Sequence, residues 1–163
     1  MHVPPEGYNH MVLHHGRSPR PAAWWLTACI LMLPVFAADG PGDLVISDAW
    51  ARATPPSSSV GAVYLTIRNR GPRPDRLTGV SSPLAASAAI HESVSRNGMV
   101  GMDPVPELAL PAGATVQIKP GGLHIMLLGL KRALAPGESF PLVLVFAAAG
   151  TVTVPVSVRA GGD

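Results

Sequence analysis

The chain has 163 residues, a formal net charge of +2 at pH 7, 13% charged residues and 47% hydrophobic residues. This length suits one domain with a substantial core, and this composition excludes an intrinsically disordered chain. The basic residues are scattered along the sequence and form no basic cluster of the kind that nucleic-acid-binding proteins carry. Eighteen prolines and seventeen glycines favour many turns and short strands, as in an all-β sandwich or barrel.

The N-terminal segment has the pattern of an export signal. A basic flank precedes an apolar run over residues 22–33, and small residues follow at positions 37 and 38. The run is shorter than the roughly 20 residues that span a membrane. It therefore predicts a cleaved secretory signal within residues 1–38 and an exported domain over residues 39–163, with no membrane insertion after cleavage. A retained N-terminal anchor helix is the alternative.

The segment Leu26–Cys29 resembles the lipobox of bacterial lipoproteins. The residues after Cys29 stay apolar, where a lipoprotein usually turns polar, so lipid attachment is the second interpretation of this segment. Cys29 is the only cysteine in the chain, and cleavage would leave a domain without a disulfide or a thiolate ligand. A blue-copper site, which requires a cysteine sulfur, is thereby excluded.

Strands separated by turn residues are predicted along the exported domain, with no helix, internal repeat or linker. This pattern predicts a single antiparallel β domain, a Greek-key sandwich or barrel. The strands are expected over residues 44–52, 61–69, 75–81, 85–95, 98–105, 114–119, 122–130, 140–147 and 152–158.

The strand expected over residues 122–130 carries two metal-donor side chains. Because successive side chains of a strand point to opposite faces, His124 and Met126 share one face, and Ile125 and Leu127 share the other. An imidazole and a thioether thus lie two residues apart, and both are donors that suit copper.

A second pair of such donors lies in a predicted hairpin. Asn97-Gly98 is a strong signal for a two-residue type I′ turn, because both central positions need positive φ. That turn pairs residue 93 with Met102 and makes Met102 a diagonal neighbour of His91 on the same face, while Met99 points to the other face. A three-residue loop would shift the register by one and exchange the two methionines.

All histidines and methionines of the exported domain fall in these two segments: two histidines and three methionines. A single strand histidine or methionine is usually structural, but two His–Met pairs with no others elsewhere favour a soft-metal site. Glu92 points away from His91, so a site for a hard cation is not expected. Trp50 and Arg52 share a face of the first strand and lie near the site or are structural; we interpret Trp50 as structural.

With these residues identified, the chain resembles the periplasmic Cu-A chaperone family, PCu(A)C. His91, ten intervening residues, Met102, twenty-one intervening residues and His124-x-Met126 match the family's metal-binding motif in order, residue type and spacing. The resemblance covers about residues 44 to 158. Further segments similar to the family are residues 48–56, 62–69, 75–77 and 120–127.

The resemblance implies a cupredoxin-like Greek-key β-barrel that binds Cu(I) through His91, Met102, His124 and Met126. It also implies a periplasmic protein that supplies copper to the Cu-A centre of cytochrome c oxidase or to another periplasmic copper protein. Two alternatives stay open: periplasmic copper storage or homeostasis, and a β-sandwich interaction module without metal. An enzyme is not expected, because the domain has no cysteine nucleophile and no carboxylate that faces a neighbouring histidine.

Overall fold

The computed structural model describes residues 43–161. The predicted export segment, residues 1–38, and the predicted start of the domain at residue 39 lie outside the described residues. The described residues all belong to one compact unit. Within residues 43–161, no helix is long and apolar enough to cross a membrane.

Ten β-strands make up the described fold. Nine correspond to the predicted strands, and the tenth, β6, was not predicted because three residues are too short to show a periodicity. The strands are β1 (Leu44–Arg52), β2 (Val60–Asn69), β3 (Asp75–Ser81), β4 (Ala85–Arg96), β5 (Met99–Pro104), β6 (Leu108–Leu110), β7 (Thr115–Ile118), β8 (Leu123–Leu130), β9 (Ser139–Phe146) and β10 (Gly150–Arg159).

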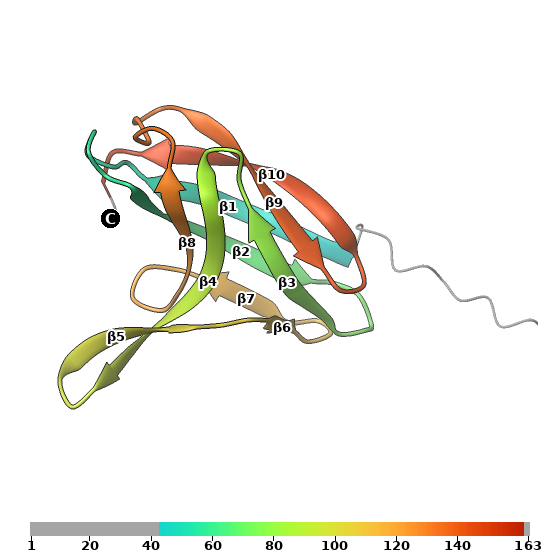
Figure 1. Ribbon diagram of the computed structural model, residues 1–163. Helices are drawn as coiled ribbons and strands as arrows, with labels where there is room; N and C mark the ends of the chain where they lie inside the picture. The colour runs from blue at the N-terminus through green and yellow to red at the C-terminus, as the bar shows by residue number, and fades with distance from the viewer. Residues whose placement is uncertain (1–42, 162–163) are drawn as a thin grey trace, which may run out of the picture. The chain divides into compact units, whose positions relative to one another are not determined.

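The strands form one sheet that curls into a barrel around the hydrophobic core. Its hydrogen-bonded order is β5-β4-β8-β2-β1-β10-β9-β3-β6, and β7 pairs with β2 outside this path. β3 and β4 stand near opposite ends of the path, yet they contact each other and lie side by side (Figure 1). The predicted all-β barrel is therefore confirmed.

One strand pair departs from the predicted antiparallel arrangement. β1 and β10 run parallel, with Trp50 opposite Ser157 and Arg52 opposite Arg159. All other strand pairs among the described residues are antiparallel. β1 also contains an irregularity: its register against β2 shifts between Ser47 and Trp50, and Asp48 has a φ of 51°. Beyond this bulge Ala51 is buried and Arg52 is exposed.

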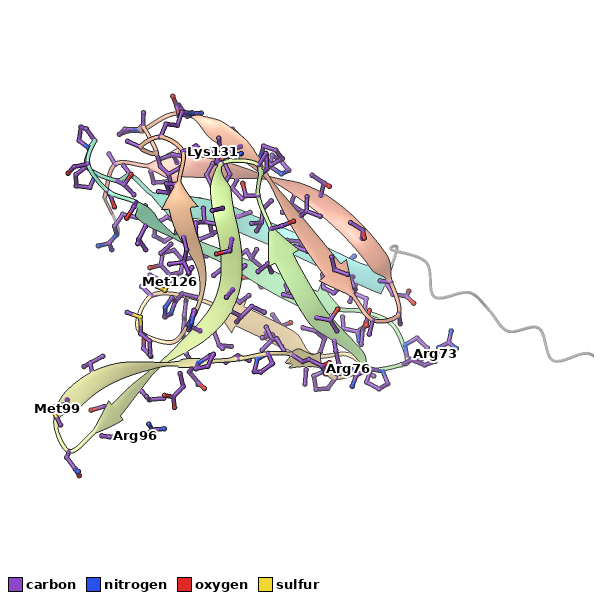
Figure 2. The ribbon with its side chains drawn as sticks, in the orientation of Figure 1. Arg73, Arg76, Arg96, Met99, Met126 and Lys131 are labelled. Atoms are coloured by element: carbon purple, nitrogen blue, oxygen red, sulfur yellow. The ribbon has the colours of Figure 1, made fainter. Side chains whose placement is uncertain are left out.

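The β4–β5 hairpin forms an arm, residues 92–103, that extends from the barrel (Figure 1). Asn97 and Gly98 have φ values of 54° and 78°, as a type I′ turn requires. Figure 2 shows Arg96 and Met99 at the outer end of this arm. The predicted register is confirmed: Arg96 lies opposite Met99, Ser93 opposite Met102, and His91 opposite Pro104.

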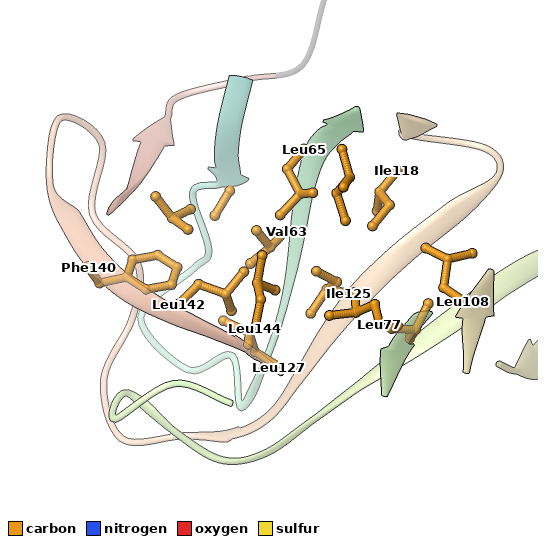
Figure 3. Packing of buried hydrophobic residues seen from close by; sticks show 14 of the residues in the cluster. Val63, Leu65, Leu77, Leu108, Ile118, Ile125, Leu127, Phe140, Leu142 and Leu144 are labelled. Atoms are coloured by element: carbon orange, nitrogen blue, oxygen red, sulfur yellow. The ribbon is translucent and has the colours of Figure 1, made fainter. Parts of the chain in front are cut away.

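The core is filled by the inward-facing residues of several strands. Leu65, Ile125 and Leu144 come from β2, β8 and β9, and each is at most 2% exposed. Figure 3 shows these side chains between the strands, where they belong to one hydrophobic cluster. Burial of each such side chain contributes about 1.5–3 kcal/mol relative to exposure. The core thereby fixes which face of β8 points outward.

Candidate metal centre

β8 lies between β4 and β2, and its outward face carries both residues of the predicted His-x-Met pair. His124 lies directly opposite His91 of β4, and Met126 lies opposite Ala89 of β4 and Ala62 of β2. Residues that are directly opposite share a face of the sheet. The intervening Ile125 is fully buried, so the two histidines and Met126 all lie on the outer face.

The two imidazole rings are stacked across the strands. The centroids of His91 and His124 are 6.1 Å apart, and their planes make an angle of 26°. Nδ1 of His124 lies 3.0 Å from the carbonyl oxygen of Gly122. A carbonyl oxygen only accepts hydrogen bonds, so Nδ1 carries the proton and Nε2 keeps its lone pair free. The same Gly122 oxygen accepts the backbone N–H of Ser93 at 3.1 Å, which ties β4 to the turn before β8.

Two buried side-chain nitrogens among residues 43–161 have no hydrogen-bond partner: Nδ1 of His91 and Nε2 of His124. Leaving a buried polar atom without a partner costs about 1–3 kcal/mol, and such atoms are rare in folded proteins. Both orphaned atoms belong to the predicted ligands. In His124 the orphaned nitrogen is also the one whose lone pair is free. This pattern is typical of a metal-ligating histidine, whose other nitrogen donates to a carbonyl or carboxylate.

The sulfur donors differ in exposure. Met126 is half-buried, whereas Met102 is 55% exposed. Met102, His124 and Met126 line one cavity of about 390 Å³, to which Ser93 and Tyr64 also contribute. His91 reaches this group through its pairing with His124. The fold therefore brings together the four residues of the motif.

Met99 lies apart from this group. It pairs with Arg96 at the outer end of the arm and is 72% exposed, and Figure 2 shows it well separated from Met126. It lies three positions before Met102 in the strand, so the two methionines face opposite sides of the arm. The hairpin register thus distinguishes the two methionines as the sequence predicted.

Carboxylates contribute little near these donors. Within residues 43–161, no three histidine, cysteine, aspartate or glutamate side chains lie close enough together to hold a metal ion. Glu92 occupies the other face of β4, and Asp103 pairs with Arg96 at 2.5 Å on that same face. The donors beside His91 and His124 are uncharged thioethers, which suit a soft, monovalent cation better than a hard divalent one.

Two aromatic residues lie next to the metal-donor residues on the outer face of the sheet. Trp50 of β1 lies opposite Tyr64 of β2 with ring centroids 4.7 Å apart, and Tyr64 lines the cavity with His124. Arg52 also lines this cavity. Tyr64 was not among the predicted site residues. Its alternation with the core residues Val63 and Leu65 was the available signal that it faces outward.

Comparison with known proteins gives consistent results. Residues 44–158 match the family model LpqE-like, described as "Putative lipoprotein LpqE-like". A relative from Leifsonia xyli subsp. xyli, described as "Putative lipoprotein Lxx21020", is 35% identical over 141 residues, which cover 82% of each chain.

Solved structures of similar fold include copper-binding domains. The copper-bound PCuAC domain from PmoF2 superposes with a TM-score of 0.64 at 29% identity, covering 74% of this chain and 95% of that one. The Cu(I) form of DR1885 from Deinococcus radiodurans gives a TM-score of 0.59 at 36% identity, covering 72% and 78%. The chain therefore belongs to the LpqE-like family, and its β-barrel is a cupredoxin-like domain of the PCu(A)C family that the motif predicted.

Proposed function

We propose that this chain is an exported copper chaperone that binds one Cu(I) ion through His91, His124, Met126 and Met102. The observation that carries the proposal is the pair of orphaned nitrogens, Nδ1 of His91 and Nε2 of His124, beside two thioethers. Coordination of an ion would satisfy both buried atoms at once. The chemistry of relatives supports the choice of metal, since the PmoF2 domain is copper-bound and DR1885 has a Cu(I) form.

The donor set favours Cu(I) over other cations. Two imidazoles and two thioethers are neutral and soft or borderline, so they stabilise a monovalent soft ion and leave Zn(II) or Cu(II) poorly matched. Thioethers need no deprotonation, whereas each imidazole must be neutral to coordinate. The domain would act as a carrier and not as an enzyme, with the copper ion as cargo.

Release would begin at the exposed ligand. Met102 is 55% exposed on the arm, so an acceptor could replace this thioether first, before the more buried Met126 and His124. We propose the Cu-A centre of cytochrome c oxidase as the acceptor. Stepwise ligand exchange needs no unfolding of the barrel.

For location, we propose export to the periplasm with cleavage of the signal. The lipoprotein descriptions of the family and of the Leifsonia relative support export. They also raise the alternative of a lipid anchor at Cys29. A Cys29→Ser variant separates the two, because it would release the protein from membranes only if a lipid is attached there.

A Cu(I) titration against a competing chelator tests the site. The test uses the chain from Ala37 onward, His124→Ala, Met102→Leu and Met126→Leu. Met99→Leu is the matched control, because it makes the same change outside the site. We expect one tight equivalent in the parent chain and in the control, with affinity weakened by about tenfold or more, or ~1.4 kcal/mol, in each of the other variants.

The outcomes separate the candidate functions. Tight binding followed by transfer to a soluble Cu-A domain supports the chaperone, whereas tight binding without transfer to any acceptor favours storage. If the parent chain does not compete with the chelator, the copper proposal is wrong and an interaction module remains.

A further inference from the structure

Two arginines face each other beside the proposed copper site. Arg52 of β1 and Arg159 of β10 are direct neighbours in the parallel strand pair. The residues before them, Ala51 and Val158, are buried, so both arginines lie on the outer face of the sheet. Like charges directly opposite each other destabilise a sheet, so this pair is unfavourable unless another group interacts with it.

No carboxylate neutralises this pair within residues 43–161. The ion pairs there join Arg76 to Glu107, Arg96 to Asp103 and Arg132 to Glu138. The guanidinium of Arg159 lies over the ring of Trp50, 5.2 Å from its centroid, in a cation–π contact. Arg52 is exposed and lines the cavity that Met102, His124 and Met126 also line. One side of the copper site is therefore cationic.

The opposite side of the site is uncharged and apolar. The face of the arm that carries Met102 also carries Val100, which is 77% exposed, and Ser93 and Ser95. The charged residues of the arm lie on its other face, where Arg96 binds Asp103. Val60, 38% exposed, extends the apolar surface along the cavity. The proposed site thus lies between an apolar flank and a cationic flank.

We propose that this face is the docking surface for a copper acceptor whose metal-binding segment carries an acidic side chain beside its ligands. The inference rests on the proposed function, because transfer requires acceptor ligands to approach the ion from the side of Met102. The acidic group pairs with Arg52 and Arg159, and an apolar side chain of the acceptor covers Val100. Complementary charge of this kind raises association rates and fixes orientation.

A second copy of this chain fits the surface poorly. Two copies that met face to face would bring four arginines together with no carboxylate between them, and like-charge juxtaposition suppresses such pairing. The chemistry of the face therefore favours an acidic partner over self-association.

Transfer kinetics to two synthetic peptides test this inference. Each peptide carries two cysteine ligands and a dansyl group that copper quenches; one has flanking aspartates, and its twin has lysines in their place. The donor is the Cu(I)-loaded chain from Ala37 onward. We expect faster transfer to the aspartate peptide, with the difference shrinking as ionic strength rises.

Variants of the two arginines test whether they cause the faster transfer to the aspartate peptide. In Arg52→Gln/Arg159→Gln we expect transfer to the aspartate peptide to slow about tenfold at low salt. Arg52→Lys/Arg159→Lys keeps the charge and should retain most of the rate. Arg68→Gln/Arg70→Gln removes the same charge near the other end of β2 and serves as the control.

Equal transfer rates for the parent and the glutamine variant with both peptides would overturn the docking inference, while the chelator titration would leave the copper proposal standing. If the parent chain does not bind Cu(I), both the copper proposal and the docking inference are wrong.

Discussion

His91 and His124 stack across β4 and β8 with ring centroids 6.1 Å apart, and Nδ1 of His124 donates to the Gly122 carbonyl. Each ring therefore presents one buried nitrogen that can bind either a metal ion or a competing proton.

The first prediction is that Cu(I) affinity falls on acidification. A proton on Nδ1 of His91 or Nε2 of His124 occupies the donor lone pair, so the affinity drops about tenfold per pH unit for each ring protonated in the free protein. Chelator competition across pH measures this slope. Removal of one ring in His124→Ala should make the slope shallower, and an equal slope in both proteins would exclude His124 as a ligand.

The second prediction concerns Asp75, which holds the turn between β9 and β10. Its carboxylate accepts the backbone N–H groups of Ala148 at 2.9 Å and Ala149 at 3.0 Å, and that of Arg76 at 2.7 Å. Burial raises the pKa of Asp75, but these N–H donors outweigh it and leave the pKa below its usual value. Because the folded-state pKa is the lower one, the stabilisation is complete above the unfolded pKa of about 3.9 and is lost as pH falls through the folded-state pKa.

We therefore expect Asp75→Asn to lower the free energy of unfolding by about 1–3 kcal/mol at neutral pH, with a smaller loss at pH 3. Denaturant titrations at the two pH values check this. Glu107→Gln is the control: it breaks the exposed ion pair with Arg76, which should matter by less than about 1 kcal/mol. A pH-independent loss in Asp75→Asn would contradict the charge-based explanation.

The third prediction concerns Gly129 near the end of β8. Its φ is 63°, and a Cβ at this position would lie 2.8 Å from Cβ of Ala86. Gly137 has a φ of 84° and nothing within 4 Å of such a Cβ. Gly137→Ala thus measures the backbone strain alone, about 1 kcal/mol, while Gly129→Ala adds a steric clash with β4. We expect the larger loss of thermal stability in Gly129→Ala, and equal losses would show that β4 moves aside without cost.

The fourth prediction concerns the loop that borders the cavity. Thr54 Oγ1 accepts the backbone N–H of Leu134 at 3.0 Å, and the Thr54 N–H donates to the Leu134 carbonyl at 3.1 Å. Thr54→Val keeps the shape but leaves the Leu134 N–H without its acceptor, at a cost of about 1–3 kcal/mol. Thr54→Ser retains the hydroxyl and should stay within about 0.5 kcal/mol of the parent chain. Chemical denaturation distinguishes the two; a larger loss in Thr54→Ser than in Thr54→Val would instead assign the effect to packing of the methyl group, which valine keeps.

Local sequence information was sufficient for much of the fold and for the register of the arm. The turn at Asn97-Gly98 fixed the pairing of residue 93 with Met102, because a two-residue turn leaves one register that puts the core residues inward. Alternation along β8 likewise placed His124 and Met126 on the face opposite Ile125.

Features that depend on distant segments were not predictable in this way. The parallel pairing of β1 with β10 joins residues about 107 positions apart, and no local pattern encodes such a partner. The positive φ of Asp48 inserts a bulge that alternation alone does not indicate. Alternation indicates that Tyr64 faces outward, but its place beside the cavity follows from the pairing of β2 with β8.

The placement of β1 between β2 and β10 also constrains the order in which the barrel assembles. Of the strands within residues 43–161, β1 comes first in the sequence and β10 last, and β1 gains its second hydrogen-bonded partner only when β10 is available. Contacts of such long sequence separation form slowly, because closure of the intervening loop must precede them. β1 therefore stays incompletely paired until β10 has left the ribosome.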